Sequence, residues 1–209
     1  MKATWYFDFV SPFAYLQLPH ILALRNRIDI TPMPIVFGAL LSHHGQLGPA
    51  EIPGKREFTY RFVQWQADRR GIVLRFPPTH PFNSLAALRL CIAAGSGWDV
   101  IAAIFDHIWR DGNRGVDAAD LAAVGNAIKV ADVTLATGLD NVKAQLRANT
   151  EEAIGAGVFG VPTLRIGGES FWGDDASAMI DAYLNNPAVF ASDEYRRIAQ
   201  LPRGVERRR

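Results

Sequence analysis

The chain has 209 residues, of which 49% are hydrophobic, and a formal net charge of +1. This balance excludes a general attraction to nucleic acid or to anionic membranes, and no uninterrupted apolar stretch is long enough to span a bilayer. The single cysteine, Cys91, excludes an internal disulfide and a cysteine-rich metal site. Cys91 lies in an apolar helical run that predicts a buried thiol, and a reducing, cytoplasmic location is the simplest interpretation.

Residues 4–16 predict a buried strand that runs directly into a helix. The strand is rich in aromatic and β-branched residues, Ser11 is a favourable N-cap, and Pro12 suits the first helical position. Pro19 falls inside the same helix and predicts a kink. Because free N–H groups and the helix dipole meet at Ser11, this junction favours an anion. The other interpretation of Ser11 is a helix cap without further function.

The next segments alternate between regular structure and a long loop. The first helix should end near Arg27, and a strand over residues 30–37 carries two prolines, which place it at an edge or a bulge. Residues 40–54 are rich in helix breakers and predict a loop. The adjacent His43 and His44 lack partners at ligand spacing, so they are weak support for a metal site, and we predict none.

A helical block should follow over residues 55–150. Its first helix, residues 55–70, carries an aromatic stripe that predicts core packing, although the same stripe could form an interface. A proline-rich extended segment leads to four further helices, expected over residues 85–94, 98–110, 117–127 and 140–156. Strand-forming sequence lies on either side of this block. We therefore predict an α/β domain formed by residues 1–54 and 151–209, with residues 55–150 as an all-helical insertion domain.

The C-terminal flank predicts a strand that begins at Pro162, a hairpin turn at Gly167–Gly168, and a last main helix that ends near Leu184. Asp174 or Asp175 should cap that helix. A carboxylate at this turn could also pair with the ammonium group of a ligand, while the N–H groups of the helix start accept a ligand carboxylate. The terminal Arg207–Arg209 run is expected to be a solvated tail.

Three motifs together indicate a family. The strand–Ser11–helix junction resembles the redox site of the thioredoxin superfamily, with Ser11 and Ala14 in place of its two cysteines, so disulfide exchange at this site is excluded. The segment around Val161–Pro162 resembles the cis-proline loop of that fold. With the Trp-Gly-Asp-Asp turn at residues 172–175, the chain resembles the kappa-class glutathione transferases and the 2-hydroxychromene-2-carboxylate isomerases, which are DsbA-like relatives.

The resemblance implies a glutathione site in a thioredoxin-like fold. Ser11 would contact the glutathione sulfur, and Val161 would pair with the glutathione backbone. Phe82 and Asn83 would face the organic substrate, which residues 40–51 would cover. Leu40 and Leu41 supply no cation for a substrate carboxylate, which leaves four basic candidates: His43, His44, Lys55 and Arg56. The γ-glutamyl end would be held by Trp172, Gly173, Asp174 and Asp175.

The resemblance also implies an activity. The first expectation is a glutathione-dependent cis/trans isomerase that interconverts 2-hydroxychromene-2-carboxylate and trans-o-hydroxybenzylidenepyruvate. It would work by reversible addition of a thiolate, in the catabolism of aromatic hydrocarbons. Two alternatives stay open: a kappa-like transferase that conjugates electrophiles, and a glutathione-binding protein without catalysis. A small aromatic oxo acid is then the expected substrate. A homodimer is the expected assembly.

Overall fold

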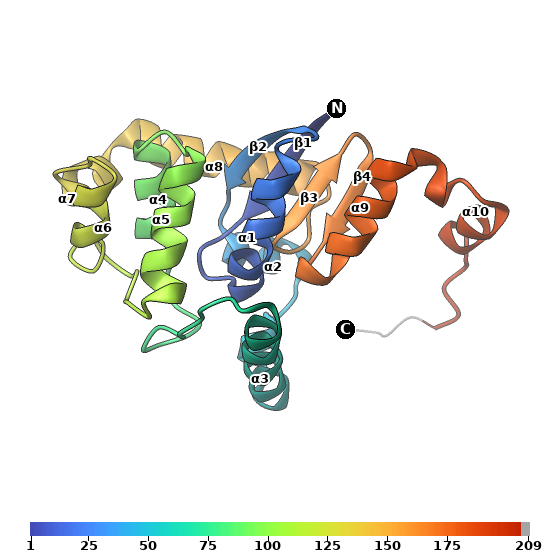
Figure 1. Ribbon diagram of the computed structural model, residues 1–209, viewed down its shortest axis with the longest axis horizontal. Coiled ribbons are helices and arrows are strands. Elements are labelled where there is room, and N and C mark those ends of the chain that lie inside the picture. The colour runs from blue at the N-terminus through green and yellow to red at the C-terminus, as the bar shows by residue number, and fades with distance from the viewer. Residues whose placement is uncertain (206–209) are drawn as a thin grey trace.

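The computed structural model describes residues 1–205, and its centre is a four-stranded mixed sheet (Figure 1). Strand order is β2-β1-β3-β4. β1 (Lys2–Phe7) pairs in parallel with β2 (Asp29–Pro34) and antiparallel with β3 (Thr163–Ile166), which pairs antiparallel with β4 (Glu169–Trp172). Both ends of the chain therefore contribute strands to one sheet, which confirms this part of the prediction.

The two faces of β1 bury different side chains because neighbouring residues of a strand point to opposite faces. Trp5 and Phe7 belong to the main core, which extends through the helices between β2 and β3. Tyr6 belongs to a second, smaller cluster with Leu40 and Ala153. Since the main core is continuous between sheet and helices, the helical part is packed onto the sheet rather than held at a distance.

Helices surround the sheet and form the long connection between β2 and β3 (Figure 1). Short 3₁₀ turns lie at Pro49–Glu51, Asp174–Ala176 and Pro187–Phe190, and a π turn at Asp106–Arg110 continues α5. None of the helices within residues 1–205 is both long and apolar enough to cross a membrane. The α-helices are α1 (Pro12–Leu24), α2 (Phe37–His44), α3 (Pro53–Arg70), α4 (Leu85–Ala93), α5 (Trp98–Phe105), α6 (Ala122–Ala127), α7 (Val133–Gly138), α8 (Asp140–Gly155), α9 (Ser177–Asn185) and α10 (Asp193–Ala199).

The predicted loop over residues 40–54 is wrong in its first part, because α2 occupies it. Gly45, which was interpreted as a breaker, is the C-cap of α2 with φ +60°, and glycine is the residue that a left-handed cap favours. Other boundaries also differ. α1 ends at Leu24 instead of Arg27, β2 covers 29–34 instead of 30–37, and the predicted helix 117–127 begins only at Ala122.

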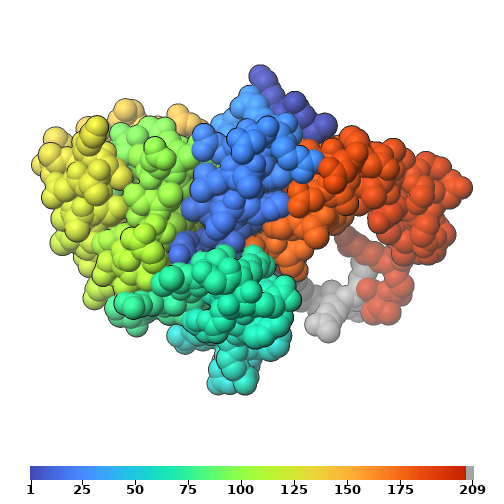
Figure 2. Space-filling view, viewed as in Figure 1, coloured from blue at the N-terminus to red at the C-terminus, as the bar shows by residue number. Residues whose placement is uncertain are grey.

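Two further differences concern α7 and α3. The helix α7, over Val133–Gly138, is not among the predicted elements. Asp132 caps it, and the Asp132 carboxylate accepts from the Leu135 N–H at 2.8 Å. The aromatic stripe of α3 is not core: Phe58 is 62% exposed and Trp65 52% exposed. α3 stands out from the body of the molecule (Figures 1 and 2), so it has too few neighbours to cover these rings. The division into two domains stays a prediction, and residues 207–209 lie outside the described residues.

Cys91 is fully buried in α4, as predicted, and burial raises the pKa of its thiol to about 12. Because the thiolate is the reactive form, we expect no reaction with a disulfide reagent in the native protein at pH 8. One thiol equivalent should react after unfolding in guanidinium chloride. Rapid labelling of the native protein would contradict this burial.

Candidate functional site

A cavity of about 770 Å³ opens at the start of α1. Its wall combines the β1–α1 junction, α2 and the turn after it, α3, the segment before α4, and the turn after β4. Most of the wall is apolar. The apolar side chains that carry this character are Phe13, Val36, Phe37, Leu41, Leu47, Phe58, Phe62, Phe82 and Leu85.

Ser11 lines this cavity, and 6% of its surface is exposed. It is the N-cap of α1, and its hydroxyl oxygen accepts from the Ala14 N–H at 3.3 Å. The same hydroxyl donates to the Val161 carbonyl over 3.4 Å, a long contact that leaves the proton free to turn toward a stronger acceptor. The Val161–Pro162 peptide bond is cis. The structure thus brings the first two predicted motifs together.

The turn that follows β4 is fixed from several sides. Gly173 has φ +91°, a conformation that favours glycine, and its N–H donates to the Pro162 carbonyl at 2.9 Å. Its carbonyl accepts from the Gln17 side-chain amide at 2.9 Å, and the amide oxygen of Gln17 accepts from the Trp5 indole at 2.8 Å. Gln17 is fully buried in α1. Sequence reasoning missed Gln17, although a glutamine among apolar helix residues was the available signal.

The two aspartates of this turn have different surroundings. Asp174 is buried and its carboxylate accepts from both terminal nitrogens of Arg70, at 2.8 and 2.6 Å. Asp175 is exposed and lines the cavity beside Trp172. The prediction that one of them caps the last helix is wrong, because Ala176 is the N-cap of α9 and no side chain caps it. The Asp174 carboxylate is instead occupied by Arg70.

The predicted substrate side is also present in the cavity wall. Phe82 and Asn83 both line it, and the Asn83 side-chain oxygen accepts from the Leu85 N–H at 3.0 Å, at the start of α4. Among the described residues, Lys55 is the one lysine or arginine side chain in this wall. The ring of His44 instead lies 3.1 Å from the Val158 carbonyl.

Arg56, another of the four basic candidates, has other partners. Its guanidinium donates to the Tyr60 hydroxyl and to the His80 carbonyl. His43 does not line the cavity either. Within residues 1–205 no group of three or more His, Cys, Asp or Glu side chains is placed to hold a metal ion. Lys55 is therefore the basic candidate that the geometry favours.

Two titratable side chains of the wall, Asp8 and His80, were not predicted as site residues. Asp8 is buried, which raises the pKa of its carboxyl, and it accepts from the Phe37 and Val10 N–H groups at 2.9 and 3.1 Å. His80 lies 2.9 Å from the Val10 carbonyl, and burial lowers the pKa of its imidazole. An acid within the apolar run of residues 5–10, just after the end of β1, is the available signal for Asp8, whereas the segment around His80 carries none.

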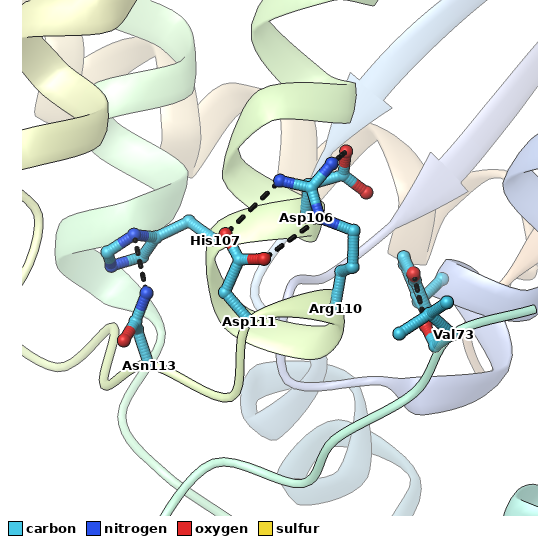
Figure 3. A network of polar contacts seen from close by, with 7 residues as sticks. Val73, Asp106, His107, Arg110, Asp111 and Asn113 are labelled. Carbon is cyan, nitrogen blue, oxygen red and sulfur yellow. Dashed lines mark hydrogen bonds and ion pairs between the residues drawn. The ribbon is translucent and has the colours of Figure 1, made fainter.

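The π turn contacts the loop that precedes Ser11. Trp109, in that turn, donates its indole N–H to the Phe9 carbonyl at 2.8 Å. At the end of the turn Arg110 pairs with Asp106 at 2.6 Å and with Asp111 at 2.9 Å (Figure 3). These ion pairs are largely exposed, so they contribute little free energy individually. Trp109 is instead held by its own burial and by its hydrogen bond to the Phe9 carbonyl.

Chemically, the site offers a helix N-terminus and a hydroxyl donor in a mainly apolar cavity. Its described wall holds one lysine, Lys55, and three carboxyl side chains, Asp8, Glu51 and Asp175. An anion is stabilised at the start of α1, where a thiolate would gain from the Ser11 hydrogen bond. The protein itself supplies no thiol there, since its only cysteine is buried in α4. The nucleophile must come from a ligand if this site does thiol chemistry.

Comparisons with known proteins agree with this geometry. The family of the DSBA-like thioredoxin domain matches residues 4–185. A 2-hydroxychromene-2-carboxylate isomerase of Pseudomonas putida is 28% identical over 202 residues, which cover 88% of this chain and 94% of that protein. The glutathione S-transferase kappa 2 of Caenorhabditis elegans is 26% identical over 178 residues, which cover 78% of this chain and 79% of that protein.

Among solved structures, a 2-hydroxychromene-2-carboxylate isomerase superposes with a TM-score of 0.77 at 24% identity, over 93% of this chain and 99% of that one. At 24% identity, this similarity is evidence for the fold alone. With the family match, it confirms the predicted fold class, an α/β thioredoxin-like fold with helices inserted between its second and third strands.

Proposed function

Because the chain belongs to the DSBA-like thioredoxin domain family, we propose that it uses this fold as a glutathione-dependent cis/trans isomerase of aromatic α,β-unsaturated oxo acids. The observation that carries the proposal is the placement of Ser11. Its hydroxyl lies at the N-terminus of α1, 3.4 Å from the Val161 carbonyl, and opens on a mainly apolar cavity of about 770 Å³. The relatives named as isomerases and as a kappa-class transferase support this class of chemistry.

Glutathione would lie along the edge formed by Ser11, Val161 and the turn after β4. Its sulfur would accept from Ser11, and its extended backbone would pair with Val161. Asp175, exposed beside Trp172, would receive the γ-glutamyl ammonium, and the N–H groups at the start of the Asp174–Ala176 turn would receive the carboxylate. Asp174 and Gly173 would act through the shape of this turn, since the Asp174 carboxylate already binds Arg70.

The chromene ring opens first, as the C2–oxygen bond of the ring breaks and the 2-hydroxyl proton passes to the ring oxygen. The isomerisation that follows uses only the thiolate and its donors. The glutathione thiolate adds to the conjugated carbon of the ring-opened substrate, and the electron pair of the double bond moves to the carbonyl oxygen as an enolate. The former double bond is now a single bond and rotates. Return of the electron pair expels the thiolate, so glutathione is regenerated. Ser11 stabilises the thiolate before addition and after elimination.

The cavity wall also suggests how the substrate is held. Phe82 and the other aromatic side chains would contact its ring, with Asn83 beside it, and Lys55 would pair with its carboxylate.

Replacing Lys55 with methionine keeps the apolar stem and removes the charge. We expect KM for the oxo acid to rise about tenfold with a smaller change in kcat, measured by initial rates. A Lys143→Met variant, on α8 outside this wall, should match the wild type.

The test of the function is an absorbance time course of 2-hydroxychromene-2-carboxylate with the purified protein, with and without glutathione, followed by a free-thiol assay. Equilibration that needs glutathione and leaves the thiol count unchanged is the expected result. Stoichiometric loss of thiol would instead assign a transferase, the alternative that the kappa-class relative favours. Absence of both conversion and glutathione binding by calorimetry would refute the proposal.

We further propose that the protein acts as a homodimer in the cytoplasm. The exposed aromatic side chains of α3, Phe58 and Trp65, offer a surface that a second copy could cover. The buried state of the only cysteine suits a reducing compartment.

A further inference from the structure

The peptide group that precedes Ser11 lies outside regular structure, and it is held by one backbone contact and one side-chain contact. Val10 lies after the end of β1 and before the start of α1. Its N–H donates to the Asp8 carboxylate at 3.1 Å, and its carbonyl oxygen lies 2.9 Å from Nε2 of His80. The Ser11 N–H donates to the Asp8 backbone carbonyl at 3.0 Å. The carbonyl side of this peptide group is therefore held by the His80 ring.

The hydrogen bonds around His80 determine its protonation state. A carbonyl oxygen only accepts, so Nε2 must carry the proton that the Val10 carbonyl receives. The Tyr60 hydroxyl oxygen lies 2.7 Å from Nδ1 and 2.8 Å from the His80 carbonyl oxygen, and it has one proton to donate. In the neutral ring, the form that burial favours, this proton goes to Nδ1. Arg56 donates to the Tyr60 oxygen at 3.1 Å and to the His80 carbonyl at 3.0 Å. The guanidinium polarises the Tyr60 O–H and opposes a second positive charge on the ring.

Aromatic neighbours also fix the orientation of this imidazole. The ring of Tyr60 lies 5.3 Å away and that of Trp109 5.4 Å away, measured between centroids, and both are roughly edge-on. Phe76 and Phe82 follow at 6.0 and 6.3 Å. Since Trp109 binds the Phe9 carbonyl, two contacting side chains hold two consecutive carbonyls of the loop before Ser11.

We propose that His80 is a positioning residue: through the Val10 carbonyl it fixes the peptide before Ser11 and so aims the Ser11 hydroxyl at the bound thiolate. Tyr60 and Arg56 hold His80 in the required tautomer. His80 lines the same cavity as Ser11, yet both of its ring nitrogens are occupied, so it takes no proton in the reaction. The inference rests on the proposed function for the identity of the anion at Ser11.

The experiment measures the ultraviolet absorbance of thiolate in bound glutathione as a function of pH. For His80→Leu we expect the thiolate fraction at pH 7 to fall about tenfold, because the Ser11 donor is no longer aimed at the sulfur. His80→Gln, whose amide can still donate to the Val10 carbonyl, should recover most of it, and Tyr60→Phe should show a smaller fall. Adding His80→Leu to Ser11→Ala should lower the fraction no further.

The matched control is His107, which also lies against backbone carbonyls, 3.1 Å from that of Arg114 and 3.0 Å from that of Asp120. It lies at the π turn, beside Asn113 (Figure 3), and it does not line the cavity. His107→Leu should lower thermal stability and leave the thiolate fraction unchanged. A His80→Leu variant that folds, binds glutathione and keeps the wild-type thiolate fraction would overturn the inference.

A second measurement needs no glutathione. Nitrogen-15 spectra of the free protein should show a protonated Nε2 and a bare Nδ1 for His80, and His80→Leu should speed hydrogen exchange of the Ser11 amide. A wild-type protein that binds no glutathione would defeat the proposed function but leave this measurement decisive for His80. The opposite tautomer, or an unchanged exchange rate at Ser11, would overturn the positioning role.

Discussion

Replacing Ser11 with alanine should slow the glutathione-dependent isomerisation by about 10²–10³-fold, the range found when one donor to a reacting anion is removed. Ser11 is the side-chain donor at the proposed sulfur position, between the start of α1 and Val161. The loss should appear mainly in kcat, with a matching rise in the pKa of the bound thiol. Initial rates with saturating glutathione and the thiolate absorbance would measure both.

The same variant also loses a helix cap, which costs about 1 kcal/mol of stability. Ser192→Ala is the matched control, since Ser192 caps α10 by accepting from the Tyr195 N–H far from the cavity. That variant should lose similar or less stability and keep full activity. Unaltered turnover in Ser11→Ala would remove Ser11 from the mechanism.

Replacing Arg70 with methionine should give the largest loss of stability among single changes near the site. Asp174 is 1% exposed, and Arg70, 30% exposed, is its ion-pair partner. Removal of one partner of a buried pair leaves a charge without compensation and costs about 3–5 kcal/mol, and we expect about 3 because Arg70 is partly exposed. The midpoint of thermal unfolding should fall by about 6–12 °C for a chain of this size.

A matched variant identifies the cause. In Arg70→Met the Asp174 carboxylate stays buried without the two hydrogen bonds that Arg70 donates to it. Arg69→Met is the control, because the Arg69 guanidinium lies over the exposed Trp65 ring and has no buried partner. An equal loss in both variants would contradict the buried-pair explanation.

The parts that could be predicted from the sequence are those whose signal is local. The β1–α1 junction depends on neighbouring residues, as Ser11 and Pro12 show, and the strand that begins after Pro162 does too. α2 was missed because its glycine C-cap looks like a loop residue until the helix before it is known. The sequence does not distinguish Asp174 from its neighbour Asp175. Only the fold shows that Arg70 binds the Asp174 carboxylate.

Side chains that support the site from a distance could not be predicted in this way. Gln17 binds the Gly173 carbonyl 156 residues further along the chain, and Arg70 binds Asp174 across 104 residues. Hydrophobic periodicity carries no information on which buried polar groups meet. Because such groups must find partners, a buried glutamine or arginine signals that a partner exists without showing where.

The support of the Ser11 loop has a consequence for the order in which the protein is made. The Phe9 carbonyl receives its bond from Trp109, 100 residues later, and the Val10 carbonyl from His80, 70 residues later. Synthesis proceeds from the N-terminus, so β1 and α1 leave the ribosome long before these two donors exist. A nascent chain that stops before residue 80 therefore carries Ser11 without a fixed loop, and the anion site matures only after the helices between β2 and β3 have been made.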